Sequence, residues 1–194
     1  MDVTVRGGQF SNAQSVNSKG EASISGEVRT QSQQAVIDGK GYNINTGSIT
    51  LTNATESALL YIKNNASDLF IVKEVIAVLS NSTGGSGNGT LRLYRNPTAG
   101  TIVTNAVNAN IGNRNFGSEL TFQGLYYKGA QGNTITGGTT LITTTRNSFA
   151  DPIPLDAEIL ALPTGATLGV SWQPPTGNTS QTAVILLIGT FLSE

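Results

Sequence analysis

Residues 58–97 read ALLYIKNNASDLFIVKEVIAVLSNSTGGSGNGTLRLYRNP, and no other stretch shows the fold class as plainly. Val, Ile, Leu and Phe dominate the run 69–79, whereas Gly, Asn and Ser dominate residues 81–89. A second run follows, in which Leu91 and Leu93 share one face. Apolar, β-branched runs separated by glycine-rich segments are typical of strand, loop and strand. We therefore predict a β-hairpin with a flexible tip, in a chain that folds as sheets.

The C-terminal third contains the clearest of the other strands. In residues 167–172 the side chains alternate, which predicts that Trp172 and its neighbours Leu168 and Val170 face the core. Residues 183–192 are apolar on both faces, a pattern of strands that are buried on both sides. We expect this strand at the centre of a sheet, with one face in the core and the other covered by the N-terminal arm or by a neighbouring subunit. Further strand-like segments are residues 41–63, 139–145 and 158–162.

The fold class follows from how these segments are spaced. The chain has no helical stripe of useful length, and Gly, Pro and Asn turns separate its many short strands. Its loops are long for an immunoglobulin-like sandwich, in which turn signals recur every ~8–12 residues. We therefore predict an all-β fold, a jelly-roll-like antiparallel β-sandwich with an extended N-terminal arm.

The 194 residues suggest one domain with an appended arm. Large apolar residues are sparse in residues 1–40, and residues 22–28 alternate small or apolar with polar side chains, so they could add as a strand to a neighbour. We predict an arm over 1–40 and a sandwich body over 41–194; the alternative for the first segment is a disordered terminus. The expected partner contacts in the arm are Val5, Phe10, Ile24 and Val28.

The charge content limits the classes of partner. Only 12% of the residues are charged, against about 25% in ordinary domains, and the net charge is −1. Neutral polar groups cost less to desolvate than charges, so this composition suits a surface that contacts other proteins. The same composition is equally typical of a β-protein with many turns. We expect no nucleic-acid partner and no membrane partner. The N-terminus lacks the pattern of a signal peptide.

Cysteine and histidine are both absent from the sequence. Their absence excludes disulfides, thiolate nucleophiles, Ser–His and Cys–His pairs, and imidazole ligands for zinc. Few enzyme mechanisms remain, so we expect a protein that is not an enzyme and needs no cofactor.

One acidic cluster offers the main chemical alternative. Asp151, Asp156 and Glu158 lie within eight residues and could bind calcium, or two of them could hydrolyse a glycoside. The ligand spacing of known calcium loops is missing, and Pro152 and Pro154 are typical of turns, so a structural loop is the favoured interpretation.

Aromatic and arginine side chains supply weaker candidates. Tyr126 and Tyr127 should lie on opposite faces of a strand, and Tyr127 is the better candidate for contact with a partner. Trp172 could join them in stacking on a sugar, but its alternating strand favours a core position. Arginine is favoured at interfaces, yet each of four arginines taken alone is more typical of a solvated surface. These are Arg92, Arg95, Arg114 and Arg146.

Two parts of the chain resemble a known group of proteins. Residues 61–101, with Leu93-Tyr94-Arg95-Asn96-Pro97-Thr98-Ala99-Gly100, and residues 162–179, with Leu162-Pro163-Thr164-Gly165, are similar to virion structural proteins of tailed bacteriophages. The similarity is to capsid decoration (cement) proteins and head-fibre components, in style and order of turns and not in a diagnostic motif. It implies a body that is often trimeric, binding to the major capsid protein on the surface of the virion, and production in the cytoplasm of a bacterial host.

Three functions follow from these observations. The leading hypothesis is a capsid decoration protein that binds and stabilises the mature phage capsid. The second is a receptor- or glycan-binding module of a head fibre or tail, and the third is a polysaccharide-degrading enzyme that uses the acidic cluster.

Overall fold

The computed structural model describes residues 15–16, 22–23, 29–146, 152–155 and 160–193, with the side chains of the strand residues 15–16, 22–23 and 155 left out. Contacts divide the chain into two units, Met1–Thr30 and Gln31–Glu194. In the first unit β1 (Ser15–Val16) pairs antiparallel with β2 (Ala22–Ser23). The four arm residues expected to contact a partner, at positions 5, 10, 24 and 28, lie outside the described residues.

The second unit, which we call the body, starts before the predicted boundary at residue 40. The helix α1 (Gln31–Ile37) packs on the last strand of the chain and on β3. Ala35 is buried in this contact, and the side chain of Val36 lies against Gly41. A Cβ on Gly41 would meet that valine at 2.7 Å, so the close approach of the helix requires glycine here.

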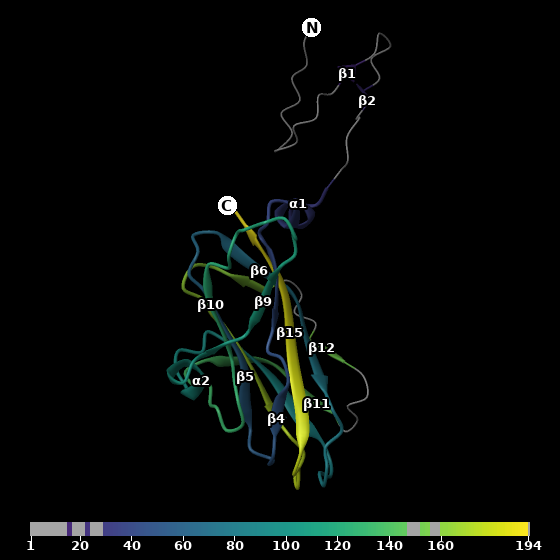
Figure 1. Ribbon diagram of the computed structural model, residues 1–194, viewed down its shortest axis with the longest axis vertical. Coiled ribbons are helices and arrows are strands. Elements are labelled where there is room, and N and C mark those ends of the chain that lie inside the picture. The colour runs from purple at the N-terminus through teal and green to yellow at the C-terminus, as the bar shows by residue number, and fades with distance from the viewer. Residues whose placement is uncertain (1–14, 17–21, 24–28, 147–151, 156–159, 194) are drawn as a thin grey trace. The chain divides into compact units, whose positions relative to one another are not determined.

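The body is an antiparallel β-sandwich, as predicted (Figure 1). One sheet, the β15 sheet, has the order β12-β6-β15-β3-β9, and the other, the β14 sheet, has the order β11-β7-β14-β5-β10-β8. The strands are β3 (Gly41–Asn45), β4 (Ile49–Leu51), β5 (Ser57–Asn64), β6 (Leu69–Leu79), β7 (Gly89–Arg95), β8 (Val107–Asn108), β9 (Asn110–Asn113), β10 (Gly124–Lys128), β11 (Thr139–Arg146), β12 (Ile153–Leu155), β13 (Leu160–Leu162), β14 (Thr167–Gln173) and β15 (Gln181–Leu192).

The order of the strands is that of a jelly roll. Along the chain, β3, β6, β12 and β15 belong to one sheet, and β5, β7, β11 and β14 to the other. The chain therefore crosses the sandwich at nearly every connection. Two strands are interrupted: β3 and β4 both run beside β15, and β12 and β13 both run beside β6. The topology agrees with the jelly-roll prediction.

The connection between β7 and β11 extends the sandwich on one side. Residues 96–138 contain the short helix α2 (Thr101–Thr104) and three strands. Of these strands, β9 adds to the edge of the β15 sheet beside β3, and β10 with β8 adds to the edge of the β14 sheet beside β5. None of the described helices is long and apolar enough to cross a membrane.

The core lies between the two sheets and matches the alternation of the sequence. Trp172 is fully buried and its indole N–H donates to Gln181 Oε1 at 2.8 Å, so its core position is confirmed. At one end of the core, Phe122 packs edge-on against Tyr42 and Phe70, with ring centres 5.5 and 5.1 Å away. Phe122 lies in a connection, not in a strand, and joins the core from the 96–138 insertion.

The predicted hairpin of residues 69–95 is wrong. Both strands form, but β6 belongs to the β15 sheet and β7 to the β14 sheet, so they do not pair. The connecting residues 80–88 are long enough to cross the ~10 Å between packed sheets, whereas a hairpin favours a tight turn. These residues are also held in place, because Thr83 pairs with Ser180 and Ser86 with Thr176, in the other crossing connection.

Candidate functional site

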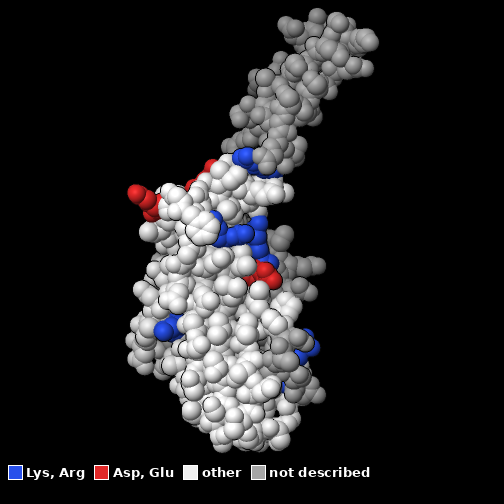
Figure 2. Space-filling model, turned by 45° about the vertical axis from the view of Figure 1, so that its right-hand side comes forward, with Lys and Arg blue, Asp and Glu red and all other residues white. Residues whose placement is uncertain are grey.

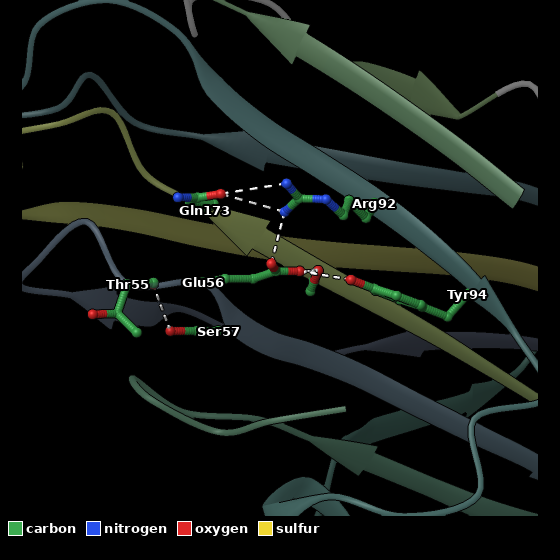
Figure 3. Close-up of polar contacts among 7 residues, drawn as sticks. Thr55, Glu56, Ser57, Arg92, Tyr94 and Gln173 are labelled. Atoms are coloured by element: carbon green, nitrogen blue, oxygen red, sulfur yellow. Dashed lines mark hydrogen bonds and ion pairs between the residues drawn. The ribbon is translucent and has the colours of Figure 1, made fainter. Parts of the chain in front are cut away.

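A charged cluster lies on the outer face of the β14 sheet (Figure 3). Glu56 precedes β5 and reaches over β14 and β7, where Arg92 Nη1 lies 2.8 Å from its Oε2. Its Oε1 accepts hydrogen bonds from the hydroxyl of Tyr94, at 2.7 Å, and from the hydroxyl of Ser171. The guanidinium of Arg92 also donates to Gln173 Oε1 at 3.4 Å. We call these five residues the Glu56 cluster.

The electrostatics of the cluster favour an ionised carboxylate. Burial by itself raises the pKa of Glu56, but hydrogen bonds from Ser171 and Tyr94 and the positive charge of Arg92 outweigh burial, so the pKa is lowered. Burial and the bond to Glu56 raise the pKa of Tyr94. The two carboxylate oxygens are both occupied by protein donors. The cluster therefore fastens residues 52–57 to the sheet.

The same face is covered by the 96–138 insertion. Ile102 of α2 is buried in a small second core with Ala58 and Tyr61, and Ile135 packs against this core. Gly169 makes room for the insertion, because a Cβ there would lie 2.6 Å from the Cδ1 of Ile135. The body thus completes this outer face with its own residues, and we call it the covered face.

The two tyrosines point to opposite faces, as predicted. Tyr126 packs edge-on against Phe122 of the main core at 5.7 Å. Tyr127 stacks on Tyr61 of the covered face, with ring centres 6.0 Å apart and planes at 12°. Burial raises the pKa of Tyr61. Because Tyr127 is half-buried beside the second core, only part of its ring is accessible, and its contact with a partner stays a prediction.

The outer face of the β15 sheet is different. Its outward residues form registered pairs across β6 and β15, Val184 with Val78 and Leu186 with Ile76, and Ile188 extends the row on β15. All five side chains are partly or fully exposed, and Val78 retains 45% of its surface. We call these five residues the open face. Neutral polar residues border them on the neighbouring strands and the connecting turn: Asn43, Asn45, Thr50, Ser80 and Thr182.

The expectation for residues 183–192 is confirmed for the inner face. Ala183, Ile185 and Leu187 are fully buried, and β15 lies between β6 and β3. On the outer face, α1 covers only one end, where Thr190 is buried. Among the described residues, no further element covers the outward side chains from Val184 to Ile188. Their neighbours in the sheet bury them only in part.

Among the described residues, the connections that meet at one end of the body contain no charged residue. The sequence has none in residues 41–55, 75–91 and 160–193. The structure joins these three segments, because Asn178 Nδ2 donates to the carbonyl of Leu51 at 3.0 Å and Ser82 donates to Asn178 Oδ1 at 2.6 Å. In Figure 2 the lower end of the body shows only uncharged side chains. At the other end of the open face stand Glu74 and Lys73, and burial together with the charge of Arg114 lowers the pKa of Lys73.

A groove lies where β4 of one sheet approaches β10 and β8 of the other. Its volume is about 450 Å³, and its lining combines hydroxyl and amide side chains with apolar ones in similar measure. Lys128 is the one charged residue of that lining. The lining comprises Ser48, Ile49, Thr50, Asn105, Val107, Lys128, Gly129, Ala130, Gln131 and Asn133.

The acidic cluster predicted as a metal or acid–base site cannot be placed. Asp151, Asp156 and Glu158 lie outside the described residues. Within residues 29–146, 152–155 and 160–193, no three Asp, Glu, His or Cys residues gather where they could hold a metal ion.

Sequence reasoning missed the Glu56 cluster. Glu56 is the only acidic residue between Asp38 and Asp68, and Arg92 alternates with Leu91 and Leu93, which places it on an outer face. Those two signals indicate single charged residues at outward positions. That Glu56 and Arg92 meet follows only from the pairing of β5 and β7 with the same strand, β14. Comparison with known proteins adds no identity: no family model matches the sequence, and no curated protein matches it.

Proposed function

We propose that this chain is a structural virion protein, a capsid decoration protein whose body binds the major capsid protein and stabilises the mature shell. The observation that carries this proposal is the open face. Five aliphatic side chains bordered mainly by neutral polar residues, with Glu74 and Lys73 at one end, resemble the composition of protein interfaces, in which apolar cores are depleted of charge and surrounded by a polar rim. A contact with another protein removes this apolar surface from water.

The small size of the open face favours a repeated contact. It extends about 14 Å along β15 and about 10 Å across the two strands, from standard strand spacings. Stable complexes bury roughly 800 Å² on each partner, so one open face supports only weak binding. On a shell, an oligomer brings several such faces to symmetry-related sites, and their binding energies add. The resemblance to decoration proteins implies a trimer for this role.

The experiment is co-sedimentation of the purified chain with capsids of its source virus from which it has been omitted. We expect saturable binding of hundreds of copies, with preference for expanded over immature shells, since a ligand of the mature shell stabilises that state by mass action. Leu186→Ser on the open face should weaken binding at least tenfold. Leu120→Ser is the matched control, because Leu120 is 53% exposed and lies outside the open face. Equal loss with both variants, or no binding at all, contradicts the proposal.

A second function is favoured by the groove. A recess of about 450 Å³ that combines hydroxyl and amide side chains with apolar ones suits a ligand with both polar and apolar faces, such as a glycan. In this alternative the chain is a receptor- or glycan-binding module of a head fibre or tail. A glycan-array screen tests it, with Asn105→Ala in the groove expected to abolish any signal and Asn88→Ala, in the exposed crossing connection, expected to retain it.

A further inference from the structure

The edges of the two sheets differ sharply in length. The β15 sheet ends in β9, with four residues, at one side and in β12 and β13, with three residues each and Pro154 in β12, at the other. The β14 sheet ends in β8, with two residues, at one side and in β11, with eight, at the other. Short strands and proline are the usual means by which proteins make an edge unsuitable for pairing with another chain. Of the four edges that the described strands form, three are protected in this way.

The fourth edge, β11, lacks those protections. It reads Thr-Thr-Leu-Ile-Thr-Thr-Thr-Arg and contains no proline, lysine or acidic residue. It pairs with β7 on one side over almost its whole length, with a register shift only near Leu141. No described residue pairs with its other side. Six of its eight side chains are exposed. β-Branched residues favour the extended conformation, so this edge is a preformed template for another strand.

We infer that β11 is a self-association edge, at which two copies of the chain pair antiparallel around a two-fold axis and join their β14 sheets. A two-fold axis perpendicular to the sheet keeps the inner face of one copy continuous with the inner face of the other. The central residue, Thr143 or a neighbour within β11, then lies opposite the same residue of the second copy. This inference concerns the chain alone and is independent of the capsid as partner.

The distribution of charge permits pairing with a second copy and favours the antiparallel orientation. Arg146, at the end of β11, is its only charged residue. In an antiparallel pair centred on Thr143, the two arginines lie six residue steps apart, about 20 Å, well beyond the ~8 Å over which salt screens charges. In a parallel pair they would be neighbours and repel each other. The remaining residues of β11 are uncharged, so no repulsion between like charges opposes pairing with β11 of a second copy.

Sedimentation velocity of the full chain between about 1 and 200 μM tests this inference first. A monomer has a mass of 20.1 kDa, and we expect a concentration-dependent shift to twice that mass. A monomer at every concentration, or a trimer, overturns the two-fold pairing. Capsid binding through the open face is measured separately, so either proposal can fail without the other: a dimer contradicts only the trimer that the resemblance implies, and not the contact with the capsid.

Disulfide cross-linking locates the contact, because the natural chain has no cysteine. Cysteine is introduced singly at positions 142, 143, 144 and 145, and the variant Thr176→Cys, in an exposed turn, serves as control. Opposite residues of paired strands have Cβ atoms about 4.5–5.5 Å apart, close to the separation that a disulfide needs. We expect one central position to give a covalent dimer at least tenfold faster than its neighbours and the control. Equal rates at all five positions indicate random collision and overturn the inference.

Discussion

The two outer faces of the sandwich are built from the same kind of strand, but the chain itself covers one face and leaves most of the other accessible. On the covered face, Ile102 and Ile135 of the 96–138 insertion close over Tyr61, and the Glu56 cluster holds residues 52–57 on the sheet. On the open face, α1 covers one end, and the aliphatic residues from Val184 to Ile188 stay accessible. The body covers one face with its own residues and leaves the aliphatic residues of the other accessible.

The two faces also differ in where their charged residues lie. The covered face contains an ion pair whose hydrogen bonds are all made within the protein, so its charges are paired before any partner arrives. The open face has charge only at its end, near Lys73 and Glu74. Desolvating the open face therefore costs little, whereas the covered face gains its stability from internal contacts.

Weakening the contact between the 96–138 insertion and the covered face should have the largest effect on the free energy of unfolding. Ile102 is 1% exposed, and Ile102→Ala should lower the free energy of unfolding by about 2–3 kcal/mol, from lost burial and a residual cavity. Urea denaturation measures the change. Ile37→Ala is the control, because Ile37 is 46% exposed. Similar losses in both variants would show that the insertion does not stabilise the covered face.

Breaking the Glu56 cluster should have the next largest effect. Glu56→Gln removes the ion pair with Arg92 and disturbs the bonds from Tyr94 and Ser171. The glutamate side chain is 36% exposed, which weakens the electrostatic term, and we expect a loss of about 1–2 kcal/mol. Urea denaturation at pH 7 measures it against Glu119→Gln, an exposed glutamate. No difference between the two variants contradicts the role given to the cluster.

Acid should reproduce part of that loss. The folded pKa of Glu56 is below its unfolded value, so the stabilisation is fully present above the unfolded pKa of about 4.3. It is lost as the pH falls through the lowered folded pKa. The difference in unfolding free energy between the natural chain and Glu56→Gln should therefore shrink below about pH 4. A difference that stays constant from pH 7 to pH 3 would show that the carboxylate charge does not contribute.

The open face should show the smallest effect on stability. Leu186→Ser replaces a half-buried side chain, and we expect a change in unfolding free energy of about 0.5–1 kcal/mol, since part of its surface is already in water. Thermal unfolding measures it. A loss as large as that of Ile102→Ala would indicate that the open face is covered within the free chain, and the contrast between the two faces would then disappear.

Much of the fold was predictable because it depends on local alternation. Residues 167–172 and 183–192 alternate or stay apolar over their whole lengths, and both form strands with the expected buried residues. The pairing partners of β6 and of β7 were not predictable in this way. A glycine-rich connection of nine residues is compatible with a hairpin and with a crossing between sheets, and only the neighbours β15 and β14 decide between them.

Strand periodicity and composition are enough to predict an all-β sandwich with a low surface charge, because both act residue by residue. Which charges meet and which apolar faces stay exposed depends on how the strands pack. Glu56 and Arg92 are 36 positions apart, and the three uncharged segments are separated by up to 119 positions, from 41 to 160. Their positions depend on strand register and sheet order, which are set by packing across the whole chain.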